Sequence, residues 1–244
     1  MLDAFRLEAH GLSQAVAGLS EDEWDLPTRC APWSVRELVG HIRVVIAWLP
    51  GMLSAPQPEA AEVSAAEYYR PDNRFAPQTN AARIGLAQQH AAGQVSGPAL
   101  AADFAETWQR VDRLCHAEPP VRVVLTRHGD AMLLSEFLVT RVVEIAVHGL
   151  DVADALGREP WLTPQAGEFV LELLLGPGHR ELPGGADTNE HMAPLPPQDV
   201  VRLALGELGW DRPRLLRKAT GREPLDIAEA ARVERLGIRW LTLG

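Results

Sequence analysis

Residues 141–151 read Arg-Val-Val-Glu-Ile-Ala-Val-His-Gly-Leu-Asp, a pattern that a simple surface helix does not have. Glu144, His148 and Asp151 stand at positions i, i+4 and i+7, and Arg141 precedes Glu144 by three residues. Because an α-helix has about 3.6 residues per turn, these polar side chains share one face. The opposite face is apolar or small at the same spacing: Leu138, Val142, Ile145, Gly149, Val152 and Leu156. The segment therefore predicts a helix that is buried on both sides, with reactive groups on one of them.

The polar face of this helix offers ligands for a metal ion. Glu144 and His148 lie about one turn apart, so a carboxylate oxygen and an imidazole nitrogen can bind the same ion. A catalytic zinc ion takes three protein ligands and keeps a fourth position open. His41 is the third candidate, because it points into the apolar stripe of an earlier predicted helix, residues 33–49. Another interpretation stays open, since the same spacing is typical of a hydrogen bond along a helix and a single inward histidine is typical of a core.

The composition excludes several classes of protein. With 244 residues, 46% of them hydrophobic, the chain can build a packed core in one large domain or two modest ones. The net charge of −10 and the 23 scattered Lys and Arg residues argue against nucleic-acid binding, which needs clustered basic side chains. The longest strongly apolar run, residues 44–49, is too short to span a membrane, which takes about 20 residues.

The cysteines indicate a reducing compartment. Cys30 and Cys115 have no Cys-x-x-Cys partner, so we expect packing thiols rather than redox catalysts. Few cysteines and no secretory signal pattern predict a cytoplasmic protein. The sequence also lacks His-Glu-x-x-His, Gly-x-Ser-x-Gly and phosphate-loop motifs. We expect small-molecule partners and a monomer or homodimer.

Hydrophobic periodicity predicts a mainly helical chain. Helices are expected over residues 2–19, 33–49, 81–92, 98–116, 135–157, 163–175, 198–208, 212–220 and 225–236. Pro32 is expected in the first turn of its helix, Ser135 as the cap of the long helix, and Gly157 as its end. Residues 51–80 predict a long loop, which would form a lid or rim, and residues 121–134 predict a short hairpin.

Two of these segments resemble the motifs of a known family. Residues 33–41, Trp-Ser-Val-Arg-Glu-Leu-Val-Gly-His, are similar to the Trp-x-x-x-x-Leu-x-x-His element of the DinB-like four-helix bundles. Residues 140–151 resemble the second metal element of that superfamily, and the match is closest to the mycothiol-dependent maleylpyruvate isomerase branch. The resemblance implies a mainly α fold. A DinB-like metal-binding bundle would cover residues 1–158, and a smaller, mostly helical accessory domain, residues 159–244, would pack on it.

The resemblance also implies roles for individual residues. His41, Glu144 and His148 match the ligands of a divalent metal, which is usually zinc in this branch. Asp151 matches the aspartate that follows the metal histidine and handles the thiol or substrate, so it is the catalytic candidate.

Three arginines are candidates for binding the thiol or the substrate. Arg222 ends the sequence Ala-Thr-Gly-Arg, which resembles an element that the branch places near the pocket; the same residues are also typical of a helix C-cap with an exposed arginine. Arg83 is a further pocket candidate. Arg141 is expected to hold Glu144 or Asp151 in place.

The function implied by the resemblance is a metal-dependent S-transferase or isomerase that uses mycothiol or a related low-molecular-weight thiol. The metal would stabilise the thiolate, which would attack an electrophilic small molecule. Two alternatives stay open: a hydrolase or lyase that uses a metal-bound water, and a non-enzymatic stress-response or ligand-binding bundle stabilised by its metal. The C-terminal part reads as shorter and more helical than the mixed α/β tail of the isomerase itself, so the isomerase's own substrate does not carry over.

Overall fold

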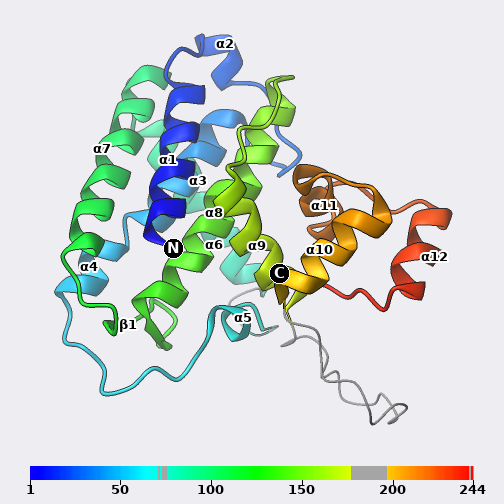
Figure 1. The fold of residues 1–244 in the computed structure, drawn as a ribbon. Helices are drawn as coiled ribbons and strands as arrows, with labels where there is room; N and C mark the ends of the chain where they lie inside the picture. The colour runs from blue at the N-terminus through cyan, green and yellow to red at the C-terminus, as the bar shows by residue number, and fades with distance from the viewer. Residues whose placement is uncertain (71, 73–75, 177–196, 242, 244) are drawn as a thin grey trace.

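Four long helices form the centre of the molecule (Figure 1). They are α1 (Leu2–Val16), α3 (Val35–Ile46), α7 (Gly97–His116) and α8 (Leu134–Ala155). Helices α1 and α3 each pack against both α7 and α8. This computed structural model describes residues 1–70, 72, 76–176, 197–241 and 243. The mainly helical class and the four-helix bundle predicted from the sequence are confirmed.

Local sequence signals explain where α3 begins. The Ser34 hydroxyl accepts a hydrogen bond from the Glu37 backbone N–H, and the Glu37 carboxylate accepts one from the Ser34 N–H. This reciprocal capping box satisfies two N–H groups that have no partner inside the helix. The prediction that Pro32 lies in the first turn was wrong, because Pro32 follows a cis peptide bond in the loop before the cap.

Helix α8 is buried on both sides, as its sequence predicts. Thr140, Arg141 and Asp151 on its polar face are at most 1% exposed, and Val142, Ile145 and Val152 on its apolar face are fully buried. Gly157, with φ of +62°, follows its C-terminal end as expected. The prediction that Ser135 caps α8 was wrong, because strand β2 (Ala131–Leu133) runs directly into the helix and leaves Ser135 in its first turn.

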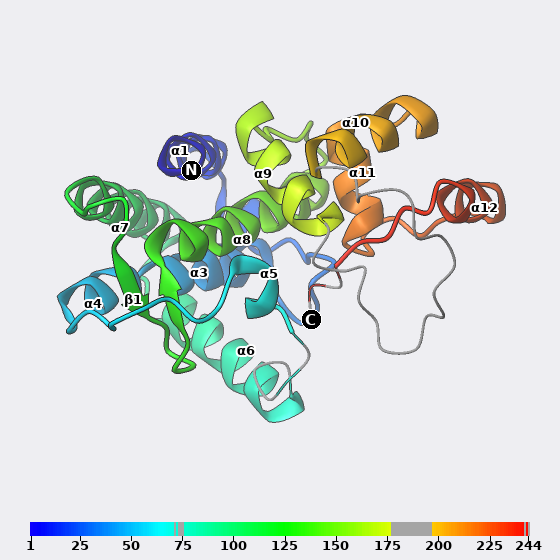
Figure 2. The ribbon, with the colours of Figure 1, turned by 60° about the horizontal axis from the view of Figure 1, so that its bottom comes forward.

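The predicted hairpin is confirmed, whereas the predicted long loop is partly helical. Strand β1 (Val123–Leu125) pairs antiparallel with β2, and Gly129 adopts a positive φ in the turn. Within and beside residues 51–80 lie two helices that the sequence interpretation missed, α4 (Leu49–Ser54) and α5 (Ala65–Tyr68). The helix expected over residues 81–92 is confirmed as α6 (Pro77–Ala92), which begins four residues earlier than predicted. Helix α6 packs along α3 on the outside of the bundle (Figure 2).

The described C-terminal residues form α9 (Pro164–Leu175), α10 (Pro197–Leu208), α11 (Arg212–Ala219) and α12 (Ile227–Arg235). Of these helices, α9 and α11 contact helices of the bundle, and α10 packs against α9, α11 and α12. A further short helix, α2 (Glu21–Trp24), follows α1 in the N-terminal part. Because α9 contacts both α1 and α8, the division at residue 158 stays a prediction. Among the helices of the described residues, none is long and apolar enough to cross a membrane.

A buried carboxylate joins α1 to the start of α9. Glu8, 1% exposed, accepts hydrogen bonds from the Thr163 N–H at 3.0 Å and the Thr163 hydroxyl at 2.8 Å. Thr163 is also the N-cap residue of α9. Burial raises the pKa of Glu8 to about 7, although both hydrogen bonds act in the opposite direction.

Replacing Glu8 by Gln is expected to change how stability depends on pH. Between the ordinary pKa of 4.5 and about 7, the folded state keeps a proton that the unfolded state releases. The free energy of unfolding of the wild type therefore falls by about 3 kcal/mol as pH rises through this window, and E8Q lacks that loss. Urea titrations of both proteins from pH 4 to 8 measure the difference. A difference that stays constant across this range would contradict the prediction.

Candidate metal centre

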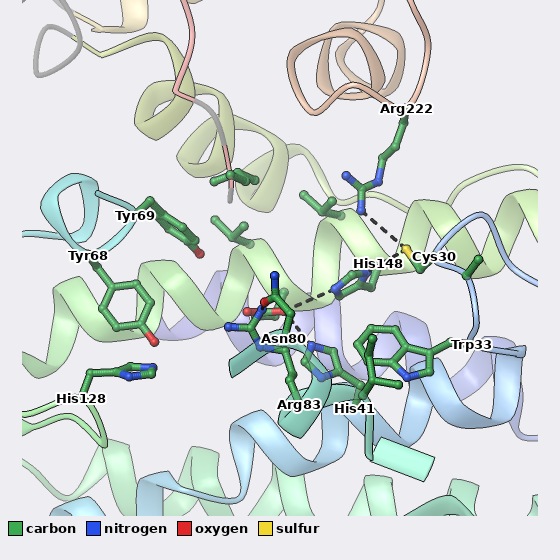
Figure 3. Close-up of a pocket in the computed structure, with 16 residues that line it drawn as sticks. Cys30, Trp33, His41, Tyr68, Tyr69, Asn80, Arg83, His128, His148 and Arg222 are labelled. Atoms are coloured by element: carbon green, nitrogen blue, oxygen red, sulfur yellow. Dashed lines mark hydrogen bonds and ion pairs between the residues drawn. The ribbon is translucent and has the colours of Figure 1, made fainter. Parts of the chain in front are cut away.

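Two helices of the bundle bring three ligand atoms together (Figure 3). His41 comes from α3, and Glu144 and His148 come from α8. Oε2 of Glu144 lies 3.2 Å from Nε2 of His41 and 3.4 Å from Nε2 of His148. All three atoms lie within 4.8 Å of one another, and the two imidazole rings are nearly perpendicular, at 87°. The three residues proposed as ligands from the sequence thus converge on one point.

The charges at this point favour a bound cation. Burial raises the pKa of Glu144, but hydrogen bonds with both histidines outweigh it and hold the pKa well below its usual range. Burial lowers the pKa of His41. Burial also lowers the pKa of His148, but hydrogen bonds with Asp151, Cys30 and Glu144 raise it well above its usual value. The carboxylates of Glu144 and Asp151 stabilise the protonated form of His148. They would also stabilise a metal ion in place of that proton.

The donor set suits a divalent metal such as zinc. Two imidazole nitrogens and one carboxylate oxygen are a common set of ligands in catalytic zinc sites, where a fourth position stays open. His41 is held in place by Trp33, whose ring stacks on it with centroids 4.7 Å apart. Each of the three candidate ligands lies on a helix of the packed bundle.

Arg141 supports Glu144 from inside the core. Its guanidinium donates to the Thr140 hydroxyl and to the Val45 carbonyl oxygen, both at 3.1 Å. Nη2 lies 3.9 Å from Oε1 of Glu144. Of the two contacts expected for Arg141, the structure has the one with Glu144; Asp151 is held by a different arginine.

Asp151 holds His148 through the other ring nitrogen. Its Oδ2 lies 3.0 Å from Nδ1 of His148, and the guanidinium of Arg222 donates to both carboxylate oxygens, at 2.8 and 2.7 Å. Burial raises the pKa of Asp151, but the hydrogen bonds with His148 and Arg222 leave it well below its usual range. A carboxylate behind a metal-binding histidine selects the ring tautomer and orientation. Asp151 thus orients His148, and its hydrogen bonds with Arg222 link α8 to the C-terminal part of the chain.

A cavity of about 360 Å³ opens onto the three ligand residues. Figure 3 shows Tyr68 and His128 at one end and Cys30 and Arg222 at the other, with His148 between them. The remaining labelled lining residues are Trp33, His41, Tyr69, Asn80 and Arg83. Both predicted pocket arginines, Arg83 and Arg222, therefore line it, whereas Arg141 lies behind Glu144.

The sequence interpretation missed the tyrosines, Asn80 and Cys30. The signal for Tyr68 and Tyr69 was present, since two adjacent aromatic residues stand out in a segment with few large apolar groups. Cys30 was expected to be a packing thiol, but its Sγ lies 3.1 Å from Oδ2 of Asp151 and it lines the cavity. Cys115 does pack in the core, where burial raises its pKa to about 12.

The bundle matches a known family of domains. The family model described as the mycothiol maleylpyruvate isomerase N-terminal domain matches residues 5–153, more than half of the chain. The chain belongs to this family. The matched region contains His41, Glu144, His148 and Asp151, whereas Arg222 lies beyond it.

The chain is similar to two mycobacterial proteins and to one protein of known crystal structure. Two curated proteins from two strains of Mycobacterium tuberculosis, both named uncharacterized, are each 32% identical over 155 residues, which is 62% of this chain. The chain spans about half the length of these relatives, with 54% of each covered. The crystal structure of a mycothiol-dependent maleylpyruvate isomerase is 17% identical, with a TM-score of 0.43; 62% of this chain and 58% of that chain are covered.

Replacing Arg222 by Met is expected to lower the free energy of unfolding by about 3 kcal/mol, because it leaves the buried carboxylate of Asp151 without its bidentate partner. Arg217→Met is the matched control, since Arg217 pairs with the more exposed Asp154 and should cost less than about 1 kcal/mol. Chemical denaturation of the two variants measures both losses. If the two variants lost the same free energy of unfolding, the buried pair of Arg222 and Asp151 would contribute no more to stability than the exposed pair of Arg217 and Asp154.

Proposed function

We propose that this family member is a metal-dependent S-transferase or isomerase that uses mycothiol or a related low-molecular-weight thiol. The observation that carries the proposal is the convergence of His41, Glu144 and His148 on the wall of a cavity large enough for small molecules. Membership of the mycothiol maleylpyruvate isomerase N-terminal domain family supports mycothiol as the thiol.

Each residue of the centre has a role in this proposal. His41, Glu144 and His148 would hold the metal, most simply zinc. When bound, the metal would act as a Lewis acid that stabilises a deprotonated thiol in its open position at neutral pH. Asp151 keeps Nε2 of His148 directed toward Glu144, and Arg222 keeps Asp151 ionised.

The cavity walls indicate how an electrophile would be held. Arg83 donates to the side-chain oxygen of Asn80 at 2.9 Å, which positions its guanidinium on the cavity wall. A guanidinium binds carboxylates well, so we assign Arg83 to an anionic group of the electrophile. Ile84, Val143 and Val147 make the wall apolar elsewhere and exclude water from the reacting atoms.

Removing any one ligand is expected to abolish stoichiometric metal binding. His41→Ala, Glu144→Gln and His148→Ala each leave two of three ligands, so the metal content after dialysis should fall from about one equivalent to near zero. His116→Ala, on the exposed end of α7, is the control and should keep the metal. Elemental analysis of the purified proteins gives the result. Full metal content in the three variants would place the metal elsewhere.

A bound thiol is expected to reach the metal directly. In the Co²⁺-substituted protein, adding mycothiol should create a sulfur-to-cobalt charge-transfer band that His148→Ala does not show. Absence of the band with every cellular thiol would favour the hydrolase or lyase alternative, in which water occupies the position. Thiol consumption then separates the two main reactions, because an isomerase regenerates the thiol and a transferase uses one per turnover. If the protein binds a metal but converts no substrate, the alternative that remains is a non-enzymatic bundle stabilised by its metal.

A further inference from the structure

His148 stands between two groups of ligand atoms, one at each ring nitrogen. Nε2 faces Glu144 and His41, as described above. Nδ1 faces a second group, with Oδ2 of Asp151 at 3.0 Å and Sγ of Cys30 at 3.8 Å. Sγ and Oδ2 are 3.1 Å apart, so the three atoms are as close together as the ligands of a single ion.

We propose that Cys30, His148 and Asp151 form a second, alternative metal site that takes thiophilic ions such as Cd²⁺. The site differs from the first by its sulfur ligand, and soft thiolates select soft ions, whereas imidazole and carboxylate alone do not. Binding forms a sulfur–metal bond and a bond from Nδ1 of His148 to the metal. The thiol proton and the proton on Nδ1 are released to solvent, with no change of oxidation state. The ion displaces the present hydrogen bond from the Cys30 thiol to Asp151.

Arg222 is compatible with an ion at this position. It donates through Nε to Oδ1 of Asp151 and through Nη2 to Oδ2. The bond to Oδ1 can remain while Oδ2 turns to the ion, because a carboxylate oxygen offers two lone pairs. The thiolate and the carboxylate would present two negative charges to the ion. Arg222 compensates them through its hydrogen bonds to Asp151 and lies 4.0 Å from Sγ of Cys30, and the more exposed Arg29 lies 4.0 Å from Oδ1 of Asp151.

The two sites exclude each other because they share one imidazole ring. A neutral imidazole has one nitrogen lone pair and one N–H. An ion on Nδ1 leaves the proton on Nε2, which faces Glu144 at 3.4 Å and no longer serves the first site. The first site then retains two ligands, so a thiophilic ion displaces the metal from it.

The test uses the full chain after its metal has been removed by a chelator, and Cd²⁺ as the probe. Titration should produce a sulfur-to-cadmium charge-transfer absorbance that saturates near one equivalent. Cys30→Ser should lose this absorbance, while Cys115→Ser should keep it, because Cys115 is buried in α7. His41→Ala should also keep the absorbance, because His41 belongs to the first site only. If circular dichroism shows that His41→Ala has lost helix, Glu144→Gln serves as the control instead.

A second titration tests the exclusion. Adding Cd²⁺ to the zinc-loaded wild type should release zinc, and Cys30→Ser should need at least about tenfold more Cd²⁺ for the same release. The proposed second site is wrong if the sulfur-to-cadmium absorbance persists in Cys30→Ser or is absent in Cys115→Ser. Cadmium binding to Cys30 without zinc release overturns the exclusion. The first titration needs no zinc, so failure of the proposed function leaves this test intact.

Discussion

The structure depends on a buried carboxylate, Asp151, which has no exposed surface in its side chain. Burying an isolated charge costs several kcal/mol, so the surrounding chain must supply partners. His148 does so from the same helix, and Arg222 does so from the segment that follows α11. One interaction therefore orients a candidate metal ligand and attaches the C-terminal part to the bundle.

The same helix explains how the charges of the centre are compensated. The side chains of Glu144 and His148 are only 21% and 14% exposed, so water compensates little of the charge on this face of α8. Glu144 is instead satisfied by two histidines from two helices and by Arg141 behind it. Trp33 limits the movement of His41 by stacking on it.

Much of the centre could be predicted from the sequence, because its signals are local. The spacing of Glu144 and His148 on one helix, and the apolar stripe behind them, required no knowledge of the fold. His41 was a candidate because of its inward position, and the family resemblance supplied the reason to prefer a ligand over an ordinary core histidine. The helix boundaries near Pro32 and Ser135 were wrong, since a loop or a strand next to the helix decides which residue caps it.

What the sequence by itself determined is the helical class and the two faces of α8, with Glu144 and His148 on the same one, because helical periodicity assigns side chains to faces without reference to other segments. The position of His41, 3.2 Å from Glu144, was decided by the packing of α3 against α8. Only the tertiary structure decided that Cys30 lies beside Asp151 and that Arg222 closes the same cluster. These residues are far apart in the chain and carry no periodic signal. Cys30 reaches Asp151 from the loop before α3, and Arg222 reaches it from the segment after α11, so both contacts depend on long-range packing that short-range patterns do not encode.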